Sequence, residues 1–354
     1  MIETLCDAGN IKSLEYVWNN LASRFQNPLL RYEWFAACAE AFCPSSRLAV
    51  VAVRSRGEIA AIAPLTQVRR GGVDTLELLG SSFLNEPSGF IYRDAESLAE
   101  LVLAVIKMRK PVLLRRLCAD SPELGALKNA CRGRAFCTIR NSSGSPFIPI
   151  TTDWAAFSSS ISSRRRSDLR RAQRRAEALG NVRFEILSPE PQQVESYLDE
   201  ILRVEAAGWK GYLGTAIMFD ERIKRFFNLY SRSAARLGML RLCFMRIDGK
   251  AVAVQIGVEH SERFWVLKIG YDEAWSRCSP GMLLTHETIR HVFERGLKAY
   301  EFLGSDQPWL RVWSKQVHPH VSLRIYPFSL EAALGLGVHM SEYLANRVLL
   351  MGER

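Results

Sequence analysis

Two stretches of the chain repeat one another. "LAVVAVRSRGEIAAIAPL", which begins at Leu48, resembles "LRLCFMRIDGKAVAVQIG", which begins at Leu240, at a constant offset of 192 residues. Gly57 falls on Gly249 at this offset. Each stretch consists of two runs of β-branched and small apolar residues around a polar turn with glycine, which predicts a β-hairpin. The fold must therefore accommodate the same hairpin twice.

The segments that follow the two hairpins also match in order. A further strand is expected at 74–80 and at 263–272, then a helix, "DAESLAELVLAVIKM" or "GMLLTHETIRHVFERG", then a strand that opens with lysine, at Lys110 or Lys298. The alternative is a chance likeness of two unrelated hairpins, against which the matching order of the later segments argues. The pattern predicts an α/β protein of two tandem modules, each a mixed β-sheet flanked by helices.

Composition and length agree with two modules. A chain of 354 residues, 48% hydrophobic and 24% charged, can bury a core in each of two globular domains. The Ser, Gly and Pro residues of 141–153 predict the join, so we expect modules at 1–150 and 151–330 and a helical tail at 331–354. No apolar run reaches the roughly 18 residues of a membrane span, and the N-terminus does not resemble a signal peptide. These features predict a cytoplasmic protein.

The junction between strand and helix differs in the two modules. In the second, "RCSPGML" places Ser279 where a helix N-cap is expected, Pro280 in the first turn and Gly281 where a ligand could approach the backbone. Free amides at a helix start attract anions. The first module has a longer segment that carries Glu86, which would repel phosphate. We therefore expect a phosphorylated ligand in the second module alone.

Seven arginines lie between Arg164 and Arg175. Residues 161–180 hold them against Asp168 and Glu177, and so carry half of the formal net charge of +10. The apolar residues of this segment recur at helical spacing, which predicts an amphipathic helix; they are Leu169, Ala172, Ala176 and Leu179. The arginines could be solvated, could contact an anionic acceptor or the phosphates of a ligand, or could bind tRNA. Charge-driven binding to long nucleic acids usually uses a wider basic face, so nucleic acid is not the expected partner.

Several kinds of catalytic site have no support in the sequence. It has no G-x-S-x-G, P-loop or G-x-G-x-x-G motif, and the six histidines form no convincing metal set. The eight cysteines include no C-x-x-C pair and are expected to be small buried hydrophobic residues. We therefore expect no metal and no covalent nucleophile.

Ordered pieces of the chain resemble a known family. They are "NPLLRYEWFAACAEAF" (27–42), the arginine segment (169–180), "EAAGWKGYLGTAI" (205–217), "IDGKAVAVQIG" (247–257), "LKIGYDEAWSRCSPGMLL" (267–284) and "EFLGSDQPWLRVW" (301–313). The chain resembles the GNAT acyltransferases of the CelD/BioF-like branch, which are related to the FemAB peptidyltransferases. The likeness covers residues 25–328 and implies two GNAT-like modules.

The resemblance implies a site for acetyl-CoA or another acyl-CoA. In this family the strand before the phosphate loop splays from its neighbour and binds the pantetheine arm. The resemblance therefore implies that the backbone of Leu267, Lys268 and Ile269 contacts this arm. The phosphate loop falls on Arg277, Cys278, Ser279, Pro280, Gly281 and Met282. One position departs from the family, because Leu310 stands where a lysine is common, with Arg311 beside it. Arg311 could hold an anion but cannot act as a base at neutral pH.

Acyl transfer from a thioester to an amine requires a docked donor, a neutral amine and a group that takes its proton. Glu205 is the first choice for this catalytic base, because it precedes Trp209 by four residues on an expected helix, where the indole could shield it from water. The alternative is an exposed helix acid. Asp306 is the second choice. Contacts to the acceptor are expected from Trp209, Lys210, Asp272, Trp309 and Arg311, although Asp272 could instead orient the loop.

We thus predict a cytoplasmic N-acyltransferase that acts on a small amine-bearing acceptor. The family branch implies an amino sugar or a precursor of the envelope or an exopolysaccharide. Two alternatives stay open. One is a FemAB-type transferase that takes its acyl group from aminoacyl-tRNA bound to the arginine helix. The other is a non-catalytic GNAT-fold binding module, which the leucine at position 310 would suit.

Overall fold

The computed structural model describes residues 2–5, 11–44, 47–208, 211 and 214–352. These residues form two compact units: unit 1 comprises 1–143 and 319–354, and unit 2 comprises 144–318. The strands β8 (Ala135–Pro149) and β14 (Val317–Pro327) each pass from one unit to the other. The sequence placed the boundaries at 150 and 330 instead. The second differs because β14 pairs with a strand of unit 1, with Leu323 opposite Leu114, so that unit 1 takes residues from both ends of the chain.

Unit 1 contains strands of two sheets. One has the order β1-β2-β3-β6, formed by β1 (Ile2–Leu5), β2 (Val50–Ser55), β3 (Glu58–Ala63) and β6 (Ile91–Tyr92). The other runs β4-β5-β7-β14-β8, with β4 (Leu65–Arg70), β5 (Val73–Leu78) and β7 (Val112–Cys118). Its helices are α2 (Glu15–Ala22), α3 (Tyr32–Phe42), α4 (Ser81–Leu84), α5 (Ala95–Lys107), α6 (Pro122–Cys131) and α13 (Leu330–Gly352), with 3-10 turns at η1 (Ser23–Phe25) and η2 (Pro28–Leu30).

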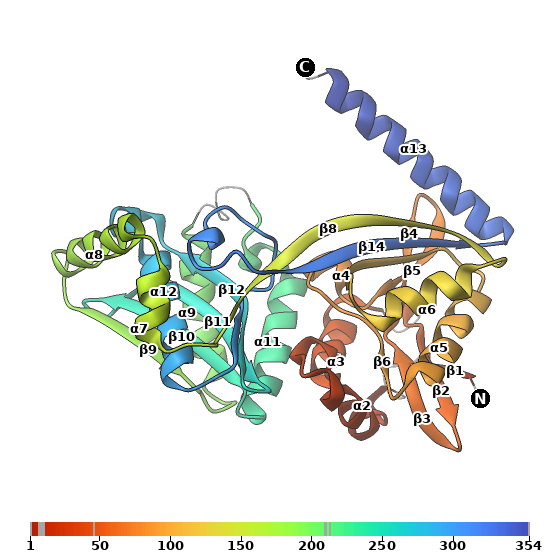
Figure 1. Ribbon diagram of the computed structural model, residues 1–354, viewed down its shortest axis with the longest axis horizontal. Helices are drawn as coiled ribbons and strands as arrows, with labels where there is room; N and C mark the ends of the chain where they lie inside the picture. Colours follow the sequence, from red (N-terminus) through yellow and green to blue (C-terminus); the bar gives the residue numbers. More distant parts are fainter. Residues whose placement is uncertain (1, 6–10, 45–46, 209–210, 212–213, 353–354) are drawn as a thin grey trace. The chain divides into compact units, whose positions relative to one another are not determined.

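Unit 2 has one mixed sheet in the order β8-β13-β12-β11-β10-β9. Its strands are β9 (Val182–Leu187), β10 (Leu240–Ile247), β11 (Lys250–His260), β12 (Arg263–Tyr271) and β13 (Ala299–Glu301). The helices are α7 (Trp154–Ser160), α8 (Ser163–Glu177), α9 (Val194–Ala206), α11 (Glu221–Arg236) and α12 (Pro280–Glu294), with 3-10 turns η4 (Ile217–Phe219), η5 (Glu273–Cys278) and η6 (Leu310–Val312). The helices α8 and α12 pack against each other, and so do α9 and α11 (Figure 1).

The structure contains the repeated hairpin. The β2–β3 turn has positive φ at Arg56 and Gly57 (54° and 87°), and the β10–β11 turn has positive φ at Asp248 and Gly249 (48° and 80°). Two successive residues with positive φ suit the tight turn that joins right-twisted strands. The register also shifts at the same point of each repeat, between Val53 and Arg54 and between Met245 and Arg246. The two hairpins therefore share a turn and an irregularity.

The segments after the hairpins keep their order and their parallel pairing, but only in unit 2 does the sheet continue from the hairpin. In unit 2, β12 pairs with β11 of the hairpin and runs parallel to β13 after α12. In unit 1, β5 likewise runs parallel to β7 after α5, but β4 is inserted before it and the hairpin belongs to the other sheet. The expected fold class, mixed α/β sheets flanked by helices, is confirmed.

Candidate active site

The parallel strands β12 and β13 of unit 2 separate after three residue pairs. Their pairing ends at Trp265 opposite Glu301, whereas β12 continues to Tyr271 along β11. Leu267 forms a β-bulge, because Val266 pairs with Gly257 and Lys268 pairs with Ile256. Bulges of this kind are frequent beside active sites, where they redirect side chains. The pairing ends where β13 itself ends, so the later part of β12 is paired only with β11.

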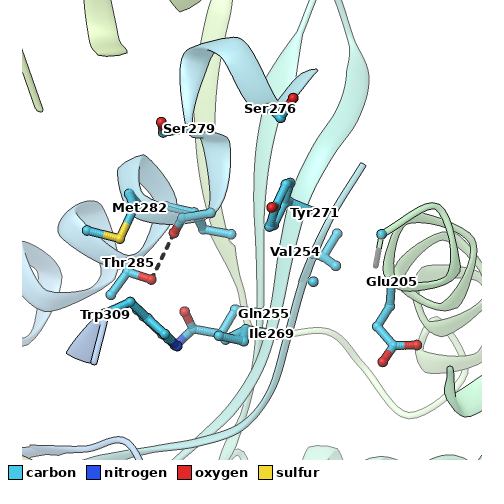
Figure 2. A pocket seen from close by; sticks show the side chains of 14 residues that line it. Glu205, Val254, Gln255, Ile269, Tyr271, Ser276, Ser279, Met282, Thr285 and Trp309 are labelled. Carbon is cyan, nitrogen blue, oxygen red and sulfur yellow. Dashed lines mark hydrogen bonds between the residues drawn. The ribbon is translucent and has the colours of Figure 1, made fainter. Parts of the chain in front are cut away.

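A cavity of about 390 Å³ lies at this end of β12 (Figure 2). Its volume is within the range of small-molecule sites, and the ends of strands next to a helix start are common places for them. Residues of α9, β11, β12, η5, α12 and the segment before η6 line it: Glu205, Gly208, Val254, Gln255, Ile269, Gly270, Tyr271, Ser276, Ser279, Gly281, Met282, Leu284, Thr285 and Trp309.

Glu205 is one of the residues that line the cavity, and its carboxylate is buried. It lies in the last turn of α9, is only 1% exposed, and its Oε2 accepts a hydrogen bond from the Ile217 N–H at 3.0 Å. It is therefore not the exposed helix acid that the sequence left as an alternative. The indole expected beside it, Trp209, lies outside the described residues, as does Lys210. Figure 2 shows Glu205 on one side of Tyr271 and the α12 residues on the other.

Two glycines allow α9 to approach β12. A Cβ at Gly270 would lie 2.8 Å from the Cα of Glu205, and a Cβ at Gly208 would lie 2.8 Å from the carbonyl oxygen of Tyr271. Atoms this close would clash, so a side chain at either position would push the helix away. These glycines were not predicted as site residues, although Gly270 lies in a strand of mainly apolar and aromatic residues.

A buried hydrogen-bonded group holds another wall of the cavity. Gln255 is 1% exposed and donates from Nε2 to the Tyr300 hydroxyl at 2.9 Å. The Thr288 hydroxyl lies 2.9 Å from the same phenol oxygen. Burial raises the pKa of Tyr300, which keeps the phenol protonated. Gln255 was not predicted as a site residue, although it is a single amide in the apolar strand "VAVQIG".

The predicted phosphate loop forms η5 and the start of α12. Asp272 orients it, because its Oδ1 accepts from the Ala274 N–H at 3.0 Å and its Oδ2 lies 3.4 Å from the Lys250 ammonium. Cys278 is buried and its thiol donates to the Trp275 carbonyl at 3.1 Å, so its side chain does not line the cavity. Burial raises the pKa of this thiol.

The start of α12 offers fewer amides than expected. Ser279 stands at the N-cap position with φ of 49°, but its hydroxyl makes no capping bond within the described chain, which corrects the N-cap role expected for this side chain. Its N–H donates to Ser276, and the N–H groups of Met282 and Leu283 donate back to the Ser279 carbonyl at 3.0 and 3.2 Å. Pro280 has no N–H. Among the described hydrogen bonds none uses the Gly281 N–H, so this amide is the donor left for an anion.

The arginine helix lies beside this loop. The sequence predicted a helix there, and α8 contacts both η5 and α12. Ala172 and Ala176 are buried, but Leu179 is 49% exposed, so the apolar stripe ends at Ala176 because the helix ends at Glu177. Arg175 donates from Nη1 to the carbonyl of Arg277 at 3.2 Å. The helix thus places positive charge next to the start of α12.

Other candidates lie away from the cavity. Asp306 and Arg311 form an ion pair at 3.0 Å, and neither is among the described residues that line the cavity, although Trp309 is. The Lys268 ammonium lies 5.8 Å from the centre of the Phe227 ring. Leu310 is 5% exposed and packs in the core of unit 2, where a lysine would be buried.

The first module also differs from expectation at Glu86. Its Oε2 lies 3.8 Å from Nη1 of Arg116, a side chain that is only 3% exposed. The pairing offsets the negative charge that was expected to repel phosphate from this module.

Comparison with known proteins supports a transferase fold. Residues 163–311 match the model of the acetyltransferase (GNAT) domain. No curated protein is similar to the chain in sequence. Within the described residues, no helix has the length and apolarity needed to cross a bilayer.

Several solved structures share the fold at low sequence identity. The chain is similar to the C-terminal domain (DUF2156) assigned to a lysylphosphatidylglycerol synthetase of Agrobacterium fabrum, with 14% identity and a TM-score of 0.57 over 94% of this chain and 96% of that one. It is similar to FemX, with 13% identity and a TM-score of 0.55 over 88% and 96%. It is also similar to L-PGS from Bacillus licheniformis, with 12% identity and a TM-score of 0.52 over 88% and 96%.

Proposed function

From the GNAT acetyltransferase domain formed by residues 163–311, we propose that this chain transfers an acyl group from acyl-CoA to the amine of a small acceptor. One observation carries the proposal: a cavity lies where β12 and β13 separate, with the start of α12 on one side and the buried carboxylate of Glu205 on the other. An acyl thioester and an amine bound together in this cavity would be held close enough to react.

The donor would lie along the end of β12. Its pantetheine arm would follow Ile269 to Tyr271, its pyrophosphate would meet the Gly281 amide, and the arginines of α8 would supply the remaining positive charge. The acyl group would then point toward Gln255 and Thr285. Because α12 offers few free amides, the arginines matter more for donor affinity here than the sequence alone suggested.

In the transfer step the neutral amine of the acceptor attacks the thioester carbonyl carbon. A C–N bond forms, the C–S bond breaks, Glu205 takes the proton of the amine, and the thiolate of CoA leaves and is protonated. Asp306 is the second choice for the base, although its ion pair with Arg311 holds it in another role. The acceptor we propose is an amino sugar or a precursor of the envelope or an exopolysaccharide, met in the cytoplasm.

Glu205→Gln tests the base. The amide keeps an acceptor for the Ile217 N–H, so we expect normal folding, unchanged acetyl-CoA affinity and turnover lower by about 10²- to 10⁴-fold. Glu195→Gln, on the same helix and 60% exposed, is the matched control. Equal turnover in the wild type and Glu205→Gln would exclude Glu205 as the base.

Gly281→Glu tests the donor site by calorimetric titration of acetyl-CoA. The negative side chain should abolish binding, and Gly281→Ala, which adds a Cβ about 3.3 Å from Tyr271 without charge, separates crowding from repulsion. A folded wild-type protein that binds no acyl-CoA would overturn the proposed donor and favour the non-catalytic module.

A second candidate donor is aminoacyl-tRNA. The seven arginines of α8 beside η5, together with the likeness in fold to FemX, favour testing it. Binding of tRNA that weakens steeply with salt, and that Arg170→Ala and Arg174→Ala reduce, would support this candidate. Binding of acetyl-CoA but not tRNA would support the first.

A further inference from the structure

Unit 1 contains a second cavity, of about 300 Å³, between the end of α3, the hairpin of β4 and β5, and α4. Arg69, Arg70, Glu77, Ser82 and Phe83 are among the residues that line it. The proposed transfer chemistry uses none of them. Charged side chains in the wall of a cavity are stable only when opposite charges or hydrogen bonds compensate them.

The only carboxylate in the wall described here is already shared by two cations. Glu77 is 0% exposed; Nε of Arg70 contacts its Oε1 and Nη1 of Arg115 lies 3.2 Å from its Oε2. Ser82 accepts from both guanidinium groups at 3.1 Å and donates to the carboxylate. A buried carboxylate gains from such pairing, but one negative charge cannot neutralise two guanidinium groups.

Further positive charge surrounds this pair. Arg69 is exposed and lines the cavity. Burial lowers the pKa of Arg115; Glu77 opposes this effect, and Arg70 and Arg324 of β14 add to it. The other acid nearby, Asp74, pairs with Arg47 at 2.7 Å and with Lys110 at 3.8 Å. It lies opposite Arg69 across β4 and β5, and Arg47, with smaller effects of Lys110 and Arg69, lowers its pKa. The arginines around the cavity therefore outnumber the carboxylates available to them.

The guanidinium groups also keep donors for a ligand. The hydrogen bonds described for Arg70 use Nε and Nη2, and those described for Arg115 use Nη1. Within the described chain, Nη1 of Arg70 and Nε and Nη2 of Arg115 make no hydrogen bond. Planar guanidinium groups with free N–H donors bind carboxylate and phosphate groups in pairs of hydrogen bonds.

We propose that this cavity of unit 1 binds the oxyanion group, a phosphate or a carboxylate, of a small organic ligand. Arg69 and Arg70, which line the cavity, would hold the anion, while Arg115 pairs with Glu77 in the wall. The apolar part of the ligand would lie against Phe42 and Phe83, whose rings stack at 4.4 Å and 7° beside the arginines. The proposal does not depend on the acyl-transfer reaction of unit 2.

Calorimetric titration of the full chain tests it, with inorganic phosphate and acetate as probes at constant ionic strength. We expect saturable binding of at least one probe. Arg69→Ala should weaken it by about tenfold, because one charge-assisted contact is lost. Arg132→Ala, which removes another exposed arginine of unit 1 outside the cavity, should leave it unchanged.

Glu77→Gln gives a change of opposite sign. If the arginines serve a ligand, removal of the negative charge should tighten binding, whereas a purely structural ion-pair cluster predicts only a loss of stability. Should this variant fail to fold, Arg69→Ala still decides, because Arg69 lies outside the pairing with Glu77. Absence of saturable binding in the wild type, or equal affinity in the wild type and Arg69→Ala, would overturn the proposal. The probe that binds more tightly, phosphate or acetate, identifies the oxyanion group of the ligand.

Discussion

An added methyl group at Gly270 is the sharpest test of how the candidate active site is built. In Gly270→Ala the new Cβ would lie 2.8 Å from the Cα, 2.9 Å from the Cβ and 3.0 Å from the Cγ of Glu205. Ordinary contacts at a Cβ are 3.4–4 Å. The nearest atom belongs to the helix backbone, so no side-chain rotation relieves the clash, and α9 and β12 must move apart by about 1 Å.

The size of the effect follows from this displacement. Overpacking of a core typically costs about 1–3 kcal/mol. For a unit of this size each kcal/mol lowers the melting temperature by roughly 2–4 °C, so we expect a fall of about 2–12 °C. Because Glu205 moves with the helix, and a displacement of about 1 Å can cost about 10²-fold in rate, turnover should fall further than stability explains.

Thermal unfolding, urea unfolding and acyl-transfer kinetics measure the two effects. Gly125→Ala is the control, because a Cβ there meets nothing within 4 Å and alanine favours the helix α6, so this variant should gain slightly in stability. A Gly270→Ala protein with wild-type melting temperature and wild-type turnover would refute the packing argument and the role given to Glu205.

Three further predictions concern buried groups. Burial raises the pKa of Glu123 from 4.5 to about 8, so between these pH values the folded state binds more protons than the unfolded state. The free energy of unfolding should therefore fall as pH rises through this window, by at most about 1.4 kcal/mol per pH unit. Urea titrations at pH 5, 7 and 9 should show a smaller change with pH for Glu123→Gln than for the wild type. Burial, aided by Arg290, lowers the pKa of His286 below 6.5, so this group contributes stability above pH 6.5 that is lost as pH falls; His286→Asn should reduce that acid-side loss in the same titrations. Tyr300→Phe removes the hydroxyl that joins Gln255 and Thr288 and should cost about 1–3 kcal/mol, read as a lower urea midpoint with an unchanged slope.

The hairpins could be predicted because their information is local. Glycine after a polar residue specifies the tight turn, and the alternation of the flanking residues specifies the strands. The sheet to which a strand belongs is not local information. Pro64, which has Ile256 as its counterpart in the second repeat, marks the break between β3 and β4, but it does not specify which sheet each strand joins. Pairing over long separations decides this, as it decides that β14 belongs with β7.

The candidate site was predictable only where residue types along the sequence carry the information. Glu205, Gly281 and Trp309 could be selected as residue types in a recognisable order, and all three line the cavity. The number of free amides at α12 depends on backbone geometry, namely on Ser279 adopting positive φ. Asp306 could not be separated from Glu205 by sequence, because its neutralising partner, Arg311, is identified only by a distance.

The passage of two strands between the units has a consequence for how the protein is made. Unit 2 is one continuous stretch, whereas the sheet of unit 1 needs β14, which the ribosome produces after all of unit 2. Since domains generally fold as units during synthesis, unit 2 can fold while unit 1 still lacks a strand. The first and last residues of unit 2, Gly144 and His318, also lie side by side. A Cβ at Gly144 would be 2.8 Å from the carbonyl oxygen of His318. Adjacent ends are those of an inserted domain, so residues 144–318 form the segment to express alone or to transplant into another protein.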